Sequence, residues 1–358
     1  MSIKVVRPFL PPKKKLFSLF NDIYKRNELT NNGKYVRELE DKLQNRFNIK
    51  NVILVANGTI GLQIAIRALG VTGEVITSPF SFIATTSSIL WEKAKPIYAD
   101  IDIDTYNINP REVSKKVSSK TSAILPVHVF GNPCDIENIN KIAKKRNLKV
   151  IYDASHCFDI NFKNRSIFEF GDCSVASFHA TKVFHTIEGG AIFTNNNQIA
   201  NKIRSIINFG MKNKIITDIG TNAKMNEFEA AMGLAIFDSA QKAKNKRKLL
   251  YSNYKNALKN SFQLQKWDQF SNNNFSYFPI VFKLKKNLKK TLKVLNENNI
   301  FPRRYFYPSL NQLKFHDLPQ TCKNSKYIAD RILCLPLYYD LKISDQRKII
   351  NLILSIFN

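Results

Sequence analysis

Short apolar runs of β-forming residues alternate with helical segments through the first two thirds of the chain. The runs are rich in Val and Ile, and helical spacing of apolar residues follows most of them. They lie at residues 52–55, 74–77, 96–100, 122–126, 150–152, 175–178 and 191–194. Strands that are apolar on both faces and joined by helices form mostly parallel sheets with helices on each side. The alternation therefore predicts an α/β fold that binds ligands at the carboxyl ends of its strands.

After this alternation the pattern changes, which indicates a second and smaller domain. A helical pattern over residues 225–259 is apolar in its first half and basic in its second half, and we interpret it as the link. Beyond it the sequence predicts strands at 276–282 and 301–307, and helices at 288–298, 325–333 and 344–357. We predict a large domain over residues 1–240, including an N-terminal segment at 1–33, and a small α/β domain over residues 241–358.

Composition excludes several classes of protein. No run of eighteen apolar residues is present and the first residues lack an apolar core, so neither a membrane span nor a signal peptide is expected. The five cysteines contain no Cys-x-x-Cys pair, which favours unbridged thiols and a cytoplasmic location. The net charge of +27 comes from scattered lysines without an aromatic RNA-binding motif, so nucleic-acid binding is not expected as the main function.

No metal site is expected either. Asp100, Asp102 and Asp104 alternate as in a calcium-binding loop, but Thr105 and Arg111 occupy the places where that loop needs Gly and Glu. The five histidines show no zinc spacing.

One lysine stands in an unusual place. Lys182 follows the run 175–178, in a loop that ends in Gly189 and Gly190 before the next run. A buried ammonium is costly unless it is paired or used, and one use is an imine bond to the aldehyde of pyridoxal phosphate (PLP). A solvated surface lysine is the alternative.

Two further stretches favour the PLP interpretation. Gly58 and Thr59 lie between a predicted strand and its helix, where free N–H groups and the helix dipole bind anions and the Thr59 hydroxyl can cap the helix. Asp153 ends another strand, and a carboxylate there needs a cationic partner such as a protonated pyridine nitrogen. Taken singly, each is also compatible with an ordinary helix cap. Together they predict a phosphate site, a carboxylate and a lysine on three strand ends.

Six stretches resemble the DegT/DnrJ-type sugar-nucleotide aminotransferases, which have the aspartate-aminotransferase-like PLP fold. They are residues 57–63 (NGTIGLQ), 78–85 (SPFSFIAT), 126–131 (PVHVFG), 153–156 (DASH), 177–190 (SFHATKVFHTIEGG) and 220–224 (GTNAK). The resemblance covers nearly the whole chain. Two positions depart from the family pattern, because Ile187 replaces the usual Gly and Lys224 stands where Arg is common.

The resemblance implies roles for the cofactor-binding residues. Lys182 holds PLP covalently and moves protons, Asp153 pairs with the pyridine nitrogen, and Phe82 stacks on the ring. His156, where the family often has Gln, contacts the ring 3-hydroxyl. The phosphate is implied to be held by Gly58, Thr59, Ile60 and Ser177, and by Asn222 of a second subunit, which requires a homodimer with shared active sites. From the residues alone, Phe82 is better explained as core and Asn222 as a turn residue.

The resemblance also implies the reaction. Residues 301–308 (FPRRYFYP), 333–339 and 184–190 are most similar to the branch that makes dTDP-4-amino-4,6-dideoxyglucose for surface polysaccharide (O-antigen) from dTDP-4-keto-6-deoxyglucose, with L-glutamate as amino donor. Arg303, Arg304 and Tyr305 are candidates to contact the substrate diphosphate, or else form surface contacts. The alternatives are a 3-keto sugar aminotransferase, a PLP-dependent sugar dehydratase, in which a relative has His in place of the lysine, and a non-enzymatic nucleic-acid-binding regulator.

Overall fold

A seven-stranded sheet is the central element of the computed structural model, which describes residues 2–313 and 320–356. Its strands, in spatial order, are β2 (Asn51–Val55), β10 (Gly190–Thr194), β9 (Cys173–Ser177), β6 (Lys149–Asp153), β5 (Thr121–Leu125), β3 (Glu74–Thr77) and β4 (Lys95–Tyr98). β10 runs antiparallel to both of its neighbours, and the other adjacent strands are parallel. The predicted α/β fold with a mixed, mostly parallel sheet is confirmed.

Alternate residues of each strand pack into two different apolar clusters, because successive side chains point to opposite faces. Val52 and Leu54 of β2 belong to one cluster, and Ile53 and Val55 belong to the other. The first cluster contains residues of α2 (Lys34–Phe47), α6 (Ile136–Arg146) and α8 (Glu227–Phe237). The second contains residues of α3 (Gly58–Ala68), α4 (Ile83–Trp91) and α7 (Asn197–Ile206). Both faces of the sheet are thus covered by helices.

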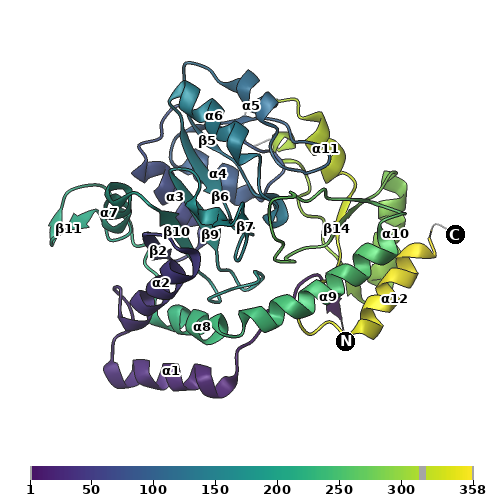
Figure 1. Ribbon diagram of the computed structural model, residues 1–358, viewed down its shortest axis with the longest axis horizontal. Helices are drawn as coiled ribbons and strands as arrows, with labels where there is room; N and C mark the ends of the chain where they lie inside the picture. The colour runs from purple at the N-terminus through teal and green to yellow at the C-terminus, as the bar shows by residue number, and fades with distance from the viewer. Residues whose placement is uncertain (1, 314–319, 357–358) are drawn as a thin grey trace.

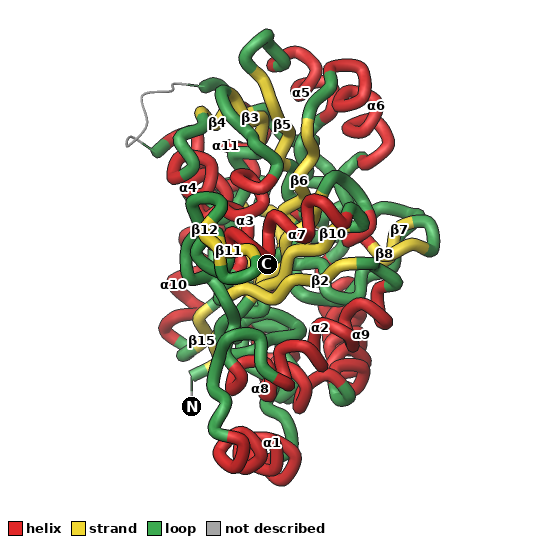
Figure 2. Tube along the Cα trace, turned by 90° about the vertical axis from the view of Figure 1, so that its left-hand side faces the viewer, coloured by secondary structure: helices red, strands yellow, loops and turns green. Residues whose placement is uncertain are grey.

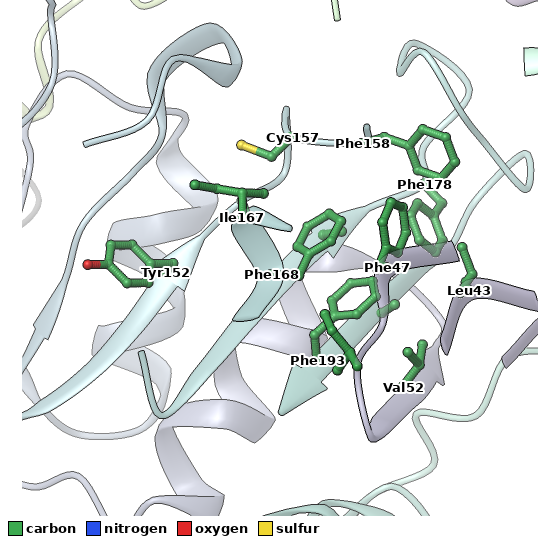
Figure 3. Close-up of a cluster of buried hydrophobic side chains, with 14 of the residues drawn as sticks. Leu43, Phe47, Val52, Tyr152, Cys157, Phe158, Ile167, Phe168, Phe178 and Phe193 are labelled. Atoms are coloured by element: carbon green, nitrogen blue, oxygen red, sulfur yellow. The ribbon is translucent and has the colours of Figure 1, made fainter. Parts of the chain in front are cut away.

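Aromatic side chains stack together in part of the first cluster (Figure 3). Phe47 of α2 meets Phe168 and Phe193 edge-on, with ring centroids 4.9 and 5.9 Å apart. Phe178, which directly follows β9, packs edge-on against Phe184 at 5.0 Å. Such pairs add stability beyond the area that they bury. The loop after β9 is therefore anchored by its own buried rings.

The C-terminal third forms a smaller unit beside the sheet, on the right of Figure 1. A three-stranded sheet, β13 (Gln263–Leu264), β14 (Pro279–Val281) and β16 (Ile332–Cys334), packs with α9 (Ala240–Leu258), α10 (Lys285–Glu297) and α12 (Ile343–Leu354). The N-terminal strand β1 (Ile3–Lys4) pairs with β15 (Ile300–Phe301) of this unit. The start of the chain therefore lies against its C-terminal third rather than against the large sheet.

The remaining elements are short or peripheral. They are α1 (Lys13–Arg26), α5 (Pro110–Lys116), α11 (Lys323–Ala329), the hairpins β7 (Asn161–Phe162) with β8 (Arg165–Ser166) and β11 (Met211–Lys212) with β12 (Ile215–Ile216), and the 3-10 turns η1 (Val129–Gly131), η2 (Ile167–Glu169) and η3 (Leu310–Gln312). Figure 2 shows the β11–β12 hairpin in front of the large sheet, and Figure 1 shows it projecting from the body. Within the described residues, no helix is both long and apolar enough to cross a membrane.

Several predicted elements differ in detail. The long helix over residues 225–259 is two helices, since the chain breaks at Asp238–Ser239 between the buried α8 and the basic α9. The helix expected at 325–333 ends at Ala329, because the apolar residues that follow form the buried strand β16. The strand expected at 301–307 is only the short β15, and the strand at 276–282 is reduced to β14. The last helix ends at Leu354 rather than at the expected Phe357, which lies outside the described residues.

Candidate active site

The functional residues gather at one edge of the sheet, where parallel strands have their carboxyl ends. β2, β6 and β9 end there, and the antiparallel β10 begins there with Gly190, which pairs with both Val55 and Ser177. A Cβ on Gly190 would come within 2.8 Å of the Gly58 nitrogen, so glycine alone lets the strands approach so closely. A cavity of about 310 Å³ opens at this edge.

Lys182 lies in the loop between β9 and β10 and lines this cavity. The loop is held by backbone hydrogen bonds from Phe178 to Gly189 and from Thr186 to Phe178, each 2.8 Å long. Burial lowers the pKa of the Lys182 ammonium to about 8, against the opposing attraction of the Asp153 carboxylate. Lys182 is half-buried rather than fully exposed, and near pH 8 a substantial fraction of it is a neutral, nucleophilic amine.

Asp153 is buried at the end of β6, with 6% of its surface exposed. Its Oδ2 accepts a hydrogen bond from the Thr85 hydroxyl at 2.8 Å, and its Oδ1 accepts one from the Ser155 N–H at 3.1 Å. Among residues 2–313 and 320–356, no Lys or Arg forms an ion pair with it. A buried carboxylate of this kind fits a cationic ring nitrogen as its partner.

The start of α3 forms the end of the cavity predicted to bind phosphate. Gly58 and Thr59 line it, and their N–H groups have no intrahelical acceptor because they begin the helix. The cap is Asn57 rather than the expected Thr59, since the Asn57 side chain accepts from the Ile60 N–H at 2.9 Å. Ile60 therefore has no free N–H to offer, and it does not line the cavity.

Ser177 completes this end of the cavity from the end of β9, which β10 separates from β2. A Cβ on Gly58 would lie 2.9 Å from the Ser177 Cβ. Glycine at position 58 therefore allows the hydroxyl of Ser177 to sit directly against the helix N-terminus, which is the geometry of an anion site.

Phe82 and His156 form the walls of the cavity. Phe82 is 53% exposed and precedes α4, so it is a wall residue and not core. His156 is buried, and its Nδ1 accepts the Phe130 N–H at 3.2 Å. Burial, and secondarily the charge of Lys182, lower the pKa of His156 well below its usual range. The imidazole is therefore neutral, and its proton is on Nε2, which leaves Nε2 as a donor.

The C-terminal unit contributes a third wall. Arg303 and Tyr305 line the cavity, as do Tyr277 and Phe306. Arg304 does not line it. Its guanidinium donates to the Ala329 carbonyl at 3.0 Å and lies over the Tyr307 ring. The two adjacent arginines were expected to act together on a diphosphate. Only Arg303 lines the cavity, and Arg304 packs against its own unit instead.

Asn222 lies outside the cavity of its own chain. It is exposed, on an extended segment that runs beside β2, where the Ala56 N–H donates to the Ala223 carbonyl at 2.8 Å. Nearby, Lys224 donates to the Asn208 side chain at 3.0 Å. The position of Asn222 is compatible with the expectation that it serves a second subunit, which stays a prediction.

Sequence reasoning missed four residues of the site. His179 and Glu188 line the cavity mouth 3.5 Å apart, and both were within a motif that we quoted without giving them a role. Thr85 ends another quoted motif. Tyr277 had no local signal, because its place depends on packing of its ring against His156, with centroids 4.8 Å apart.

The assembled donor set fits PLP. An anion site at α3, a flat aromatic wall, a buried carboxylate and a lysine of lowered pKa surround one cavity. PLP, when bound, supplies an electron sink that withdraws electrons from a carbon attached to the substrate amine.

Comparisons with known proteins agree with this geometry. The chain is 40% identical over 349 residues to a dTDP-4-amino-4,6-dideoxy-D-glucose transaminase of Shigella dysenteriae, covering 95% of each chain. It is 37% identical to the Escherichia coli protein of the same name, covering 99% of this chain and 98% of the relative. The solved structure of DesI with its TDP-sugar product superposes with a TM-score of 0.94 at 30% identity, covering 99% of this chain and 93% of DesI. Residues 12–354 match the family model, and the chain belongs to the DegT/DnrJ/EryC1/StrS aminotransferase family of PLP-dependent enzymes.

Proposed function

We propose that this aminotransferase converts dTDP-4-keto-6-deoxyglucose to dTDP-4-amino-4,6-dideoxyglucose, with L-glutamate as amino donor. The observation that carries the proposal is that Lys182, whose pKa is lowered to about 8, and the buried Asp153 line one cavity, which Arg303 also lines. The names of the Shigella dysenteriae and Escherichia coli relatives support this sugar. Glutamate leaves as 2-oxoglutarate, and its amine replaces the keto oxygen of the sugar, which leaves as water.

The residues of this chain divide the work. Lys182 as a neutral amine takes and returns the proton at the reacting carbon, since its lowered pKa allows both directions near neutral pH. Asp153 keeps positive charge on the ring nitrogen, and His156 donates from Nε2 to the ring oxygen. The N–H groups of Gly58 and Thr59, with the Ser177 hydroxyl, hold the phosphate.

We further propose that the enzyme works as a homodimer with shared active sites. The β11–β12 hairpin and its flank expose Ile215, Ile216 and Ile219 at 66, 73 and 74%, an apolar patch that a second copy is suited to cover. Asn222 lies in the segment that returns from this hairpin, and we assign it to the phosphate of the partner's cofactor. All five cysteines are buried and unbridged, which supports a cytoplasmic site for making a surface-polysaccharide precursor.

The visible absorption spectrum of the purified protein tests the proposal. We expect a PLP band that glutamate bleaches and dTDP-4-keto-6-deoxyglucose restores. A band that bleaches and is restored only by a 3-keto sugar nucleotide identifies the 3-keto enzyme. Consumption of the sugar without incorporation of nitrogen identifies a dehydratase. Absence of any band after PLP is added, together with salt-sensitive DNA binding, contradicts the enzyme and supports the regulator.

A further inference from the structure

Two buried hydroxyls form a chain behind the Asp153 carboxylate. The Thr85 Oγ1 lies 2.8 Å from the Asp153 Oδ2, and the Ser81 Oγ lies 2.7 Å from the Thr85 Oγ1. Thr85 is fully buried and Ser81 is 2% exposed. Three polar groups are thus connected in a part of the molecule that faces the cavity on one side and the core on the other.

The direction of both hydrogen bonds follows from proton counting. An ionised carboxylate only accepts, so the hydrogen between Thr85 and Asp153 comes from the Thr85 hydroxyl. That hydroxyl has a single hydrogen, so the hydrogen between the two hydroxyls comes from Ser81. The chain therefore runs from Ser81 to Thr85 to Asp153, and each donor strengthens the next.

We propose that Thr85, supported by Ser81, is a positioning residue that holds the Asp153 carboxylate oriented toward the pyridine nitrogen of PLP. This proposal rests on the proposed role of Asp153. A hydroxyl that donates to one carboxylate oxygen fixes the rotation of the carboxylate. With the Ser155 N–H on Oδ1 and Thr85 on Oδ2, each oxygen keeps a lone pair for the ring.

The same short segment also carries the aromatic wall. Phe82 precedes α4, and the Thr85 N–H donates to the Phe82 carbonyl at 3.2 Å. One helical turn therefore fixes both the ring-face contact and the donor to the carboxylate. Replacing Thr85 is expected to alter the contact between Asp153 and the ring nitrogen of PLP. Replacing its neighbour Thr86 is not expected to alter this contact.

Thr86 provides a matched control. It is equally buried on the same helix, and its hydroxyl contacts the Tyr98 hydroxyl at 3.0 Å rather than Asp153. The variants are Thr85→Val, Thr85→Ser, Ser81→Ala and Thr86→Val. For each, the dissociation constant of PLP is measured on cofactor-free protein, and the visible band of the loaded enzyme is titrated with pH.

We expect Thr85→Val to raise the dissociation constant of PLP about tenfold and to move the titration of the visible band to higher pH. The shift arises because a pyridine ring with a weaker contact to Asp153 withdraws less electron density from the Lys182 nitrogen. That nitrogen then loses its proton only at a higher pH. Thr85→Ser is expected to restore both values, Ser81→Ala to give about a twofold effect in the same direction, and Thr86→Val to match the wild type.

Equal effects of Thr85→Val and Thr86→Val, or failure of Thr85→Ser to restore the spectrum, overturn the proposal. If Thr85→Val does not fold, Ser81→Ala decides: a spectrum identical to wild type contradicts the chain of donors. A wild-type protein that binds no PLP overturns the proposed function and this inference together, whereas normal wild-type binding with an unaltered Thr85→Val overturns this inference alone.

Discussion

The inner half of the cavity and its rim are built on different principles. We call Lys182, Asp153 and His156 the inner half, and His179, Glu188 and Arg303 the rim. Asp153 and His156 are buried at or just after the end of β6 and have fixed hydroxyl or backbone partners, and Lys182 is half-buried in the loop after β9. At the rim, the side chains of His179 and Glu188 are 45% and 55% exposed, and Arg303 is exposed although its backbone is bridged to Cys334 of β16. The difference indicates that cofactor chemistry is preorganised by the sheet, whereas substrate choice is left to loops.

Replacing Lys182 tests the inner half most severely. Lys182→Ala is expected to reduce turnover at least ~1000-fold, because no other group at the reacting carbon can exchange the proton. Steady-state kinetics with the sugar nucleotide and glutamate measure this loss. Lys120→Ala, an exposed lysine far from the cavity, is the control and should keep wild-type activity. Retention of full activity by Lys182→Ala would remove the lysine from the mechanism.

The lowered pKa of Lys182 predicts a specific pH dependence. With a pKa of about 8, the neutral fraction of this amine rises about fiftyfold from pH 6 to pH 8 and then levels off. The rate at which cofactor-free protein gains the PLP band should follow the same curve. In Asp153→Asn the midpoint should fall, because the carboxylate raises the pKa of Lys182. A rate that climbs steeply above pH 9 would instead indicate an ordinary, solvated lysine.

Two neighbouring arginines test the rim. Arg303→Ala is expected to raise KM for the sugar nucleotide by about 10- to 100-fold with little change in kcat, because a charge-assisted contact to the diphosphate is lost. Arg304→Ala should leave KM unchanged and lower thermal stability, since its bond goes to the Ala329 carbonyl. The reverse outcome, with KM altered only by Arg304→Ala, would show that the loop is arranged differently with substrate bound.

Sequence alone predicted much of the inner half, and the reason is physical. Asp153 ends β6, and its neighbours in the cavity, Ser177 and Gly58, end β9 and begin the helix after β2; parallel strands bring their carboxyl ends to one edge. The alternation of strands and helices was therefore enough to bring these residues together. The correct site for Lys182 follows from the same rule, because its loop joins β9 to β10.

The helix cap, the direction of Arg304 and the place of Tyr277 could not be predicted from the sequence. They depend on competing contacts between side chains, which the spacing of residue types does not show. The Asn57 side chain takes the Ile60 N–H that was expected to bind phosphate, and it replaces Thr59 as the cap. Arg303 and Arg304 are adjacent in sequence, but packing against Tyr307 turns Arg304 away. Tyr277 reaches the site through ring contacts with Phe130 and His156 across the two units. Such tertiary choices have no periodic signature.

The smallest predicted effect concerns Ile187, which precedes the rim residue Glu188 in the loop that carries Lys182. Its φ of 76° lies in the left-handed region, which is unfavourable for a β-branched residue, and its side chain is 46% exposed. Ile187→Gly should relieve this strain and raise stability by about 0.5–1 kcal/mol after the entropy of glycine in the unfolded chain is subtracted.

Thermal unfolding measures this effect, with an expected rise in Tm of about 1–2 °C. Ile187→Ala is the matched control, because it removes the same exposed side chain but keeps a Cβ in the left-handed region. If alanine stabilises the protein as much as glycine, the exposed apolar side chain of Ile187, and not its backbone conformation, lowers the stability of the wild-type protein. If only glycine stabilises the protein, the backbone of the loop that carries Lys182 is strained at position 187, where the family usually has glycine. The strained conformation of this loop then lowers the stability of the folded protein.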